Sequence, residues 1–166
     1  MGAKRLKKLF EKPRRLWNKT RIESESALKT EFGLKNSREL WRIQTILRNI
    51  RREARRILAG KGADLEKRTE ALINRVKRLL INKEEVGIEE ILGLKVDDVL
   101  SRRLESVIVK KGMSKTMKQS RQLIVHGHIS IKGKKVNSPS YLVKFDEEPE
   151  VGWFKKPIKT SEAATK

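Results

Sequence analysis

Residues 36–60 contain the feature that most constrains the fold, an apolar stripe that repeats with the period of an α-helix. Asn36 is a suitable N-cap, Glu39 follows three residues later as in a capping box, and Gly60 is a helix stop. The apolar positions are Leu40, Ile43, Leu47, Ile50, Ala54 and Ile57 or Leu58. A helix of this length buries its apolar face, so the chain is expected to fold around residues 36–60.

The opposite face of the same predicted helix is cationic. It carries Arg48, Arg51, Arg52, Arg55 and Arg56, and only Glu53 interrupts the series. Spacings of three and four residues place these guanidinium groups on one side of a helix, where each can bind a phosphate bidentately. The alternative is an ordinary solvated face, but such faces interleave carboxylates. The pattern therefore favours contact with phosphates.

The charge of the whole chain points to the same class of partner. Lys and Arg number 41 against 21 Asp and Glu, which gives a formal net charge of +20. Nucleic acid suits this density, because each phosphate neutralised by a cation releases condensed counterions. A membrane surface is the alternative, but it favours amphipathic helices with aromatic anchors, and only 5% of these residues are aromatic.

Composition also limits the chemistry. Hydrophobic and charged residues each make up 37% of the chain, which favours two small packing units over one large core. Without Cys there is no thiolate chemistry, disulfide or Cys-ligated metal site. No segment approaches the ~20 apolar residues of a membrane span, and the basic N-terminus lacks the apolar region of a signal peptide. We expect a soluble intracellular protein with no cofactor, no metal and no catalytic site.

We expect four segments along the chain. Residues 1–21 form a basic arm with Arg14 and Arg15, partly disordered until it meets RNA, which Leu16 and Trp17 could pin to a surface. Residues 22–95 form a helical domain with helices over 22–34, 36–60 and 64–82, the last two paired as an αα-hairpin, and a helical turn over 84–94. Residues 96–145 form a small α-β domain, and residues 146–166 a tail.

The α-β domain is expected to contain two helices followed by strands. Asp97 or Asp98 caps a helix that ends at Gly112, and Ser114 caps a second helix over 115–125. Two β-type runs, 128–131 and 135–136, flank a tight basic turn, and 141–143 is a third strand. The predicted fold class is α+β, a helical bundle followed by an α-α-β-hairpin-β unit.

Candidate RNA-binding residues also occur in this α-β domain. The start of the second helix offers backbone N–H groups for a phosphate, and cations on both helices and in the turn extend this surface. The candidates are Arg102, Arg103, Ser114, Lys115, Thr116, Lys118, Arg121, Gln122, Lys132 and Lys134. Each could instead be a solvated surface residue.

The two histidines and three tryptophans are the remaining candidates for contact with RNA. His126 and His128 flank Gly127, but they have no Cys or carboxylate partner nearby, so we expect base stacking, phosphate contact or simple packing and not a metal site. Trp17, Trp41 and Trp153 are interpreted as structural, and Trp41 in particular should pack.

Specific motifs resemble a known family. The segment RLESVIVKKGMSKTMKQSRQLIVHGHISIKGKKVNSPSYLV resembles the RNA-binding fold named after ribosomal small-subunit protein four. That fold also occurs in tRNA synthetases and pseudouridine synthases. EFGLKNSRELWRIQTILRNIRREARRIL and ILGLKVDDVLSRRLE are similar to the archaeal and eukaryal branch of the small-subunit protein four family. The resemblance spans about residues 12–145, which leaves no room for a catalytic domain.

The resemblance implies a structural protein of the small ribosomal subunit in the cytoplasm. It implies binding of small-subunit rRNA at a helix junction in the five-prime body region, nucleation of assembly, and a place near the channel through which mRNA enters. Neighbouring small-subunit proteins are expected partners, and the acidic residues after Phe145 either meet such a neighbour or balance charge. The alternatives are a free RNA-binding translation or stress factor and the RNA-binding unit of an RNA-modifying enzyme.

Overall fold

The structure is a computed structural model that describes residues 9–60, 64–83 and 86–155. These residues form two compact units, the first containing 9–60, 64–74 and 86–97, the second containing 75–83 and 98–155. The second half of the helix predicted over 64–82 thus belongs to the second unit, and the later boundary lies close to the one predicted. No helix of the described residues has the length and apolar character needed to cross a membrane.

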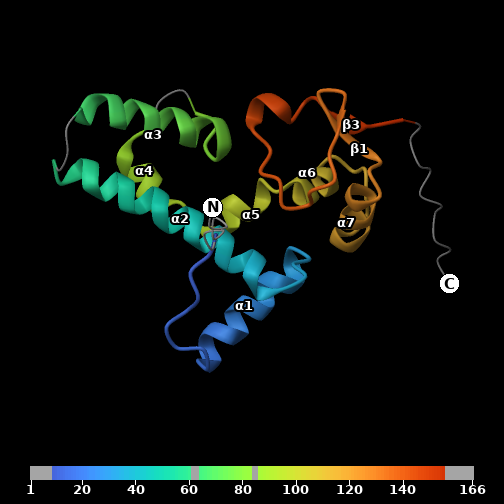
Figure 1. The fold of residues 1–166 in the computed structure, drawn as a ribbon, viewed down its shortest axis with the longest axis horizontal. Coiled ribbons are helices and arrows are strands. Elements are labelled where there is room, and N and C mark those ends of the chain that lie inside the picture. Colours follow the sequence, from blue (N-terminus) through green and yellow to red (C-terminus); the bar gives the residue numbers. More distant parts are fainter. Residues whose placement is uncertain (1–8, 61–63, 84–85, 156–166) are drawn as a thin grey trace, which may run out of the picture. The chain divides into compact units, whose positions relative to one another are not determined.

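The first unit is built around the long helix α2 (Ser37–Leu58), as the apolar stripe predicts (Figure 1). The Asn36 side chain caps it by accepting a hydrogen bond of 3.1 Å from the Glu39 backbone N–H. Leu40, Ile43, Leu47, Ile50 and Ala54 are all buried, so the predicted face is the core face. The predicted helix over 36–60 is confirmed.

The other helices of the first unit are α1 (Lys19–Glu31), the part of α3 (Leu65–Leu79) up to Asn74, and α4 (Ile88–Gly93). α1 and α4 provide the principal helix packing of α2, whereas the prediction paired α2 with the helix after Gly60. α1 begins three residues earlier than predicted because Asn18 caps it, and Gly33 follows its end with a φ of 59°. The fully buried Ile91 anchors the short helix α4.

In the second unit the first predicted helix is broken in two. α5 (Val96–Ser101) and α6 (Leu104–Lys110) are separated by Arg102 and Arg103, where the prediction drew one continuous helix. The break follows from backbone pairing, because the Leu104 N–H donates to the Tyr141 carbonyl at 2.8 Å and the Val143 N–H donates to the Arg102 carbonyl at 2.9 Å. Helix α7 (Met117–Val125) follows.

The sheet of the second unit has three antiparallel strands in the order β2-β1-β3. They are β1 (Ile129–Ile131), β2 (Lys134–Lys135) and β3 (Val151–Trp153). The predicted hairpin is confirmed, and its turn has Lys132 at φ 52° and Gly133 at φ 72°, as a two-residue turn with two positive φ angles requires.

The predicted third strand over 141–143 is wrong. That segment forms only an isolated bridge, Arg103 with Leu142, and its backbone groups bond to the break between α5 and α6 instead. β3 pairs with the other edge of β1. Residues 146–155, which were expected to start a tail, therefore belong to the second unit, and a 3-10 turn lies at Phe145–Glu147. The core contains Leu104, Val107, Ile108, Leu123, Ile124, Ile129, Ile131, Val143 and Val151.

Candidate nucleic-acid interface

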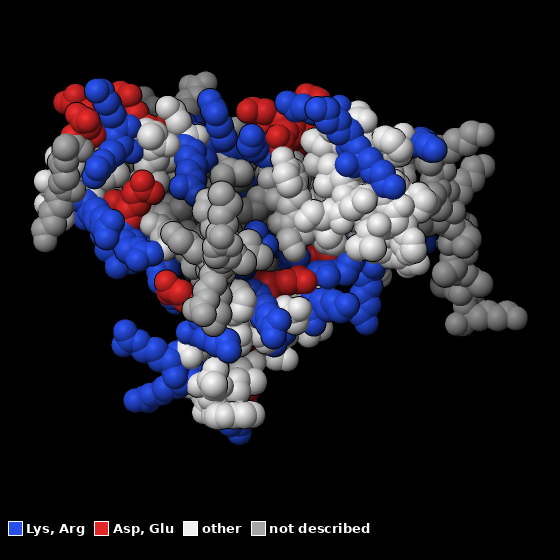
Figure 2. Space-filling view, viewed as in Figure 1, with Lys and Arg blue, Asp and Glu red and all other residues white. Residues whose placement is uncertain are grey.

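The cationic face predicted for residues 48–56 is present on α2. Arg48, Arg52, Arg55 and Arg56 are exposed on this helix, and Arg51 is half-buried. Figure 2 shows Lys and Arg side chains gathered along α2 on the face in view, with few acidic side chains among them. We call Arg48, Arg51, Arg52, Arg55 and Arg56 the α2 arginine face.

The members of the α2 arginine face differ in how they are held. Arg48 forms an ion pair with Glu11, Arg51 donates to the Leu94 carbonyl, and Arg52 donates to the Asn49 side chain. Within the described part of the chain, the Arg55 and Arg56 side chains make no hydrogen bond or ion pair. The face therefore combines positioned guanidinium groups with two that are available to an external anion.

A pocket of about 480 Å³ lies at the C-terminal end of this face. Arg52 and Arg56 line it together with Arg68 of α3, beside Asn49, Glu53 and Ile57. Three guanidinium groups around one hollow form a suitable seat for a phosphate. Arg68 was missed in the sequence, where it lies between Glu66 and Glu70 and on a different helix from Arg52 and Arg56.

The basic arm is more ordered than predicted from residue 9 onward, while residues 1–8 of that segment lie outside the described residues. Glu11 fixes the arm to α2, since its N–H donates to Thr45 Oγ1 at 3.1 Å and its carboxylate pairs with Arg48. The Phe10 ring contacts the Trp41 ring at 6.1 Å between centroids. Phe10 and Glu11 thus anchor the arm, whereas the expectation that Leu16 and Trp17 would pin it is wrong, because they are 53% and 93% exposed.

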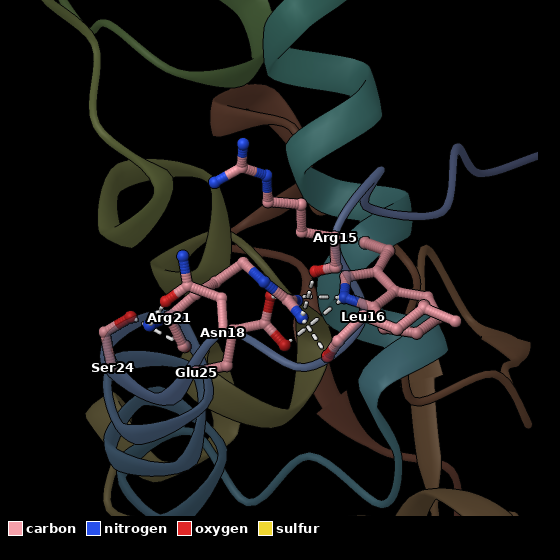
Figure 3. A network of polar contacts seen from close by, with 7 residues as sticks. Arg15, Leu16, Asn18, Arg21, Ser24 and Glu25 are labelled. Carbon is pink, nitrogen blue, oxygen red and sulfur yellow. Dashed lines mark hydrogen bonds and ion pairs between the residues drawn. The ribbon is translucent and has the colours of Figure 1, made fainter.

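A buried carboxylate holds the other end of the arm (Figure 3). Glu25 is 5% exposed, accepts from Arg21 at 2.6 Å and accepts from the indole N–H of Trp41 at 3.2 and 3.3 Å. Arg21 also donates to the backbone carbonyls of Arg15 and Leu16 at 3.2 and 2.8 Å.

This network keeps the predicted candidates Arg14 and Arg15 in solvent on an ordered backbone. Trp41 packs as predicted. Glu25 itself was missed, although its i, i+4 spacing from Arg21 was a usable signal.

At α7 the predicted phosphate seat is not built as expected. Thr116, not Ser114, is the N-cap, and its hydroxyl accepts from the Gln119 N–H at 3.2 Å. The Lys115 N–H donates to Gln119 Oε1 at 2.9 Å, so it is already occupied. Ser114 is buried at 5% exposure. The prediction of free N–H groups at residues 114–116 is therefore wrong for Lys115, and Ser114 lies below the surface.

The outer side of α7 does present several predicted candidates. Lys118, Gln122 and His126 are exposed at successive spacings of four residues, so they form one row along the helix. The His126 and His128 rings stack with centroids 6.3 Å apart. Lys115 is exposed beside the start of this row, Lys132 is exposed in the hairpin turn, and Lys134 is exposed at the start of β2. Lys132 lies 3.9 Å from Glu150.

Three other predicted candidates point into the protein. Arg103 and Glu105 are each 1% exposed at the side chain and lie 3.0 Å apart, and Arg121 Nε lies 2.6 Å from Glu105. Arg102 pairs with Glu148 at 2.5 Å, donates to the Val143 carbonyl and covers the Phe145 ring at 3.9 Å.

A buried carboxylate needs such partners, because an unpaired charge in the interior is costly. The expectation that Arg102 and Arg103 reach an RNA groove from an exposed helix face is therefore wrong. Arg121 pairs with Glu105 and does not belong to the exposed row of Lys118, Gln122 and His126.

The acidic residues after Phe145 mostly balance charge inside the second unit. Glu147 accepts from the Tyr141 hydroxyl at 2.9 Å, and Glu148 and Glu150 pair with Arg102 and Lys132. Within the described ranges, no group of three His, Cys, Asp or Glu side chains is placed to hold a metal ion.

Comparison with known proteins agrees with this arrangement. Residues 102–148 match the family model described as the S4 domain. The chain is 44% identical over 149 residues to small ribosomal subunit protein uS4 of Nanoarchaeum equitans, covering 89% of this chain and 83% of that protein. It is 40% identical to the protein of the same name from Methanococcus vannielii and 37% identical to that from Methanothermobacter thermautotrophicus, covering 85% and 88% of their lengths.

The predicted resemblance is thereby confirmed on both units, since each match covers about nine tenths of this chain. With identities above one third and most of each relative covered, the chain belongs to the uS4 family of small ribosomal subunit proteins.

Proposed function

We propose that this protein is a structural component of the small ribosomal subunit in the cytoplasm and binds its rRNA. The α2 arginine face, the pocket with Arg68 and the row Lys118, Gln122 and His126 are the surfaces that we assign to RNA. Two observations support the proposal. The relatives that match most of this chain are named as small ribosomal subunit proteins, and the chain has a net charge of +20. It assigns a structural role and no catalytic one.

The finer role follows from the family resemblance. We infer that the rRNA target is a helix junction in the five-prime body region, that binding nucleates assembly of the subunit, and that neighbouring ribosomal proteins complete the site. A position near the channel through which mRNA enters would bring exposed cations into reach of the message. Crosslinking the assembled subunit to mRNA and mapping the protein residues tests that last point, and a map without residues of this chain rejects it.

The single observation that carries the proposal is the availability of Arg55 and Arg56 on the α2 arginine face. The Arg55 and Arg56 side chains are exposed and have no partner among the described residues, although Glu53 stands on the same helix. Exposed like charges at spacings of one to four residues repel one another, and an anion of matching spacing removes that repulsion. A polyphosphate backbone supplies such anions.

A filter-binding titration tests the proposal directly. The full chain is titrated with small-subunit rRNA and with an unrelated folded RNA of similar length, at salt concentrations from about 50 to 200 mM. With roughly 6–10 phosphate contacts, affinity should fall by about 10³- to 10⁵-fold over that range. Equal affinity for the two RNAs would reject rRNA as the specific partner.

A matched pair of variants locates the surface. Arg55→Gln removes one exposed charge from the α2 arginine face, and Arg78→Gln removes one exposed charge from α3 that belongs to none of the surfaces assigned to RNA. We expect Arg55→Gln to weaken rRNA binding by about tenfold near 0.1 M salt and to lower the salt slope by about one. The Arg78→Gln variant should bind nearly as the unaltered chain does, and equal losses would show that total charge matters and the face does not.

A further inference from the structure

Trp17 is the most exposed of the large hydrophobic residues that the structure describes as exposed, at 93%. We predicted a structural role for it, and that prediction is wrong, since its ring is almost fully in solvent. Trp41 and Trp153, by contrast, are half-buried. A fully exposed indole is a large unsatisfied apolar surface with a flat face, which suits a stacking partner.

The backbone on both sides of Trp17 is nevertheless fixed. Before it, the Leu16 carbonyl accepts from Arg21 at 2.8 Å (Figure 3), and after it, Asn18 caps α1 by accepting from the Arg21 N–H at 3.2 Å. Arg21 is itself held by the buried Glu25. The ring is thus presented on an ordered mount, which lowers the entropy that binding would otherwise cost.

The charges around Trp17 select among the possible partners. Lys12, Arg14, Arg15 and Lys19 are exposed near it in sequence, whereas Glu11, the one acid of this stretch from residue 9 to residue 21, is paired with Arg48. An apolar protein surface that covered the indole would have to desolvate these cations without neutralising them. An RNA strand supplies both a base for the ring and phosphates for the cations.

We propose that Trp17 is a base-stacking residue, which takes an unpaired RNA base on its exposed face while neighbouring cations of the arm bind the flanking phosphates. The proposal rests on the proposed function for the class of ligand, RNA, and adds the residue and the chemical group that it recognises. Base stacking on an aromatic side chain tolerates any base, so Trp17 would fix position and not sequence.

The experiment separates the base from the phosphate. The full chain is titrated at low salt with a 12-nucleotide oligoadenylate and with an abasic ribose-phosphate oligomer of the same length. Stacking predicts that the unaltered chain binds the oligoadenylate more tightly, and that Trp17→Ala lowers this affinity by about 5- to 150-fold while leaving the abasic affinity unchanged. Trp17→Phe, which keeps an aromatic ring, should lie within a few-fold of the unaltered chain.

Leu16→Ala is the matched control, because Leu16 is the adjacent exposed apolar residue and keeps its backbone carbonyl for Arg21. It should change neither affinity. Oligoadenylate should also quench part of the tryptophan fluorescence of the unaltered chain, and Trp17→Phe should lack that part while Trp41 and Trp153 still emit. Circular dichroism confirms that the variants keep their helix content.

Three results would overturn the proposal. If Trp17→Ala loses affinity equally for both oligomers, the ring acts on the cations and not on a base. If the unaltered chain binds the two oligomers with equal affinity, the ring contacts no base. The same follows if Trp17→Ala binds the oligoadenylate as tightly as the unaltered chain does, and the exposed indole would then be a contact for a protein partner. Both readouts are independent of the rRNA preference test, so stacking can hold where rRNA specificity fails, and the reverse.

Discussion

The arginines of α2 and the arginines around Glu105 show opposite uses of the same side chain. On α2, the Arg55 and Arg56 side chains are exposed and have no partner among the described residues. In the second unit, Arg102 and Arg103 are 6% and 1% exposed and pair with the protein's own carboxylates. The two sets differ in the acidic residues around them, because the fold places Glu148 next to Arg102 and Glu105 next to Arg103.

This comparison shows when an arginine indicates RNA binding in a basic chain. A series at helical spacing with few acids within one turn keeps some members available, as Arg55 and Arg56 show, even where tertiary contacts engage Arg48. An isolated pair such as Arg102-Arg103 gives no such assurance, because residues far along the chain decide its environment. Glu148 is 46 residues from Arg102 in sequence and forms a 2.5 Å ion pair with it.

The largest expected effect comes from the buried acid of the second unit. Glu105→Gln leaves Arg103 and Arg121 without their carboxylate, so the free energy of unfolding of the second unit should fall by about 3–5 kcal/mol. Hydrogen exchange of the α6 and α7 amides in urea measures it. Glu150→Gln, which breaks only the exposed pair with Lys132, should change stability by less than about 0.5 kcal/mol. Similar small effects from both would show that the buried set is not structural.

Removing the exposed set should instead act on RNA. A variant with Gln in place of Arg48, Arg52 and Arg55 should bind rRNA about 10²- to 10³-fold more weakly near 0.1 M salt. Each lost phosphate contact lowers the affinity by close to a factor of ten. The free energy of unfolding should stay nearly constant, because exposed charges contribute little to it. Filter binding and urea denaturation of the same preparation measure both quantities. A loss of stability that matches the loss of affinity would erase the contrast between the two sets.

The arm tests a mixed case, a buried acid that positions exposed arginines. Glu25→Gln keeps the shape of the side chain but removes the charge that holds Arg21, which is 25% exposed at the side chain. We expect a loss of about 1–2 kcal/mol in unfolding free energy, smaller than for Glu105 because solvent screens this pair. Amide exchange at Arg21 and Ile22, whose N–H groups donate to Asn18, should accelerate. Unchanged exchange there would mean that Arg21 and Glu25 do not order the arm.

The smallest expected effect separates the predicted cap of α7 from the observed one. Thr116→Ala should cost about 1 kcal/mol, because the hydroxyl accepts from the Gln119 N–H. Ser114→Ala should be nearly neutral, since the buried Ser114 hydroxyl makes no hydrogen bond within the described residues. Thermal denaturation of the two variants compares them, and a larger loss for Ser114→Ala would restore it as the cap.

Local patterns predicted much of this molecule. The cap at Asn36, the buried stripe from Leu40 to Ala54 and the hairpin turn at Gly133 each depend on residues only a few positions apart. The third strand failed for the opposite reason, because Tyr141-Leu142-Val143 and Val151-Gly152-Trp153 both suit a strand. Pairing with β1, about 20 residues earlier in sequence, chose the second segment.

The amino-acid sequence by itself determined the charge, the amphipathic α2 with its arginine face and the family, since composition, helical period and motif identity are properties of neighbouring letters. Only the tertiary structure decided which cations are left for RNA. It buried Arg103 with Glu105, tied Arg48 to Glu11, and left Trp17 exposed while the Phe10 ring contacts Trp41. Burial and the Arg48–Glu11 ion pair depend on residues that are distant along the chain, so no short-range pattern in the sequence encodes them.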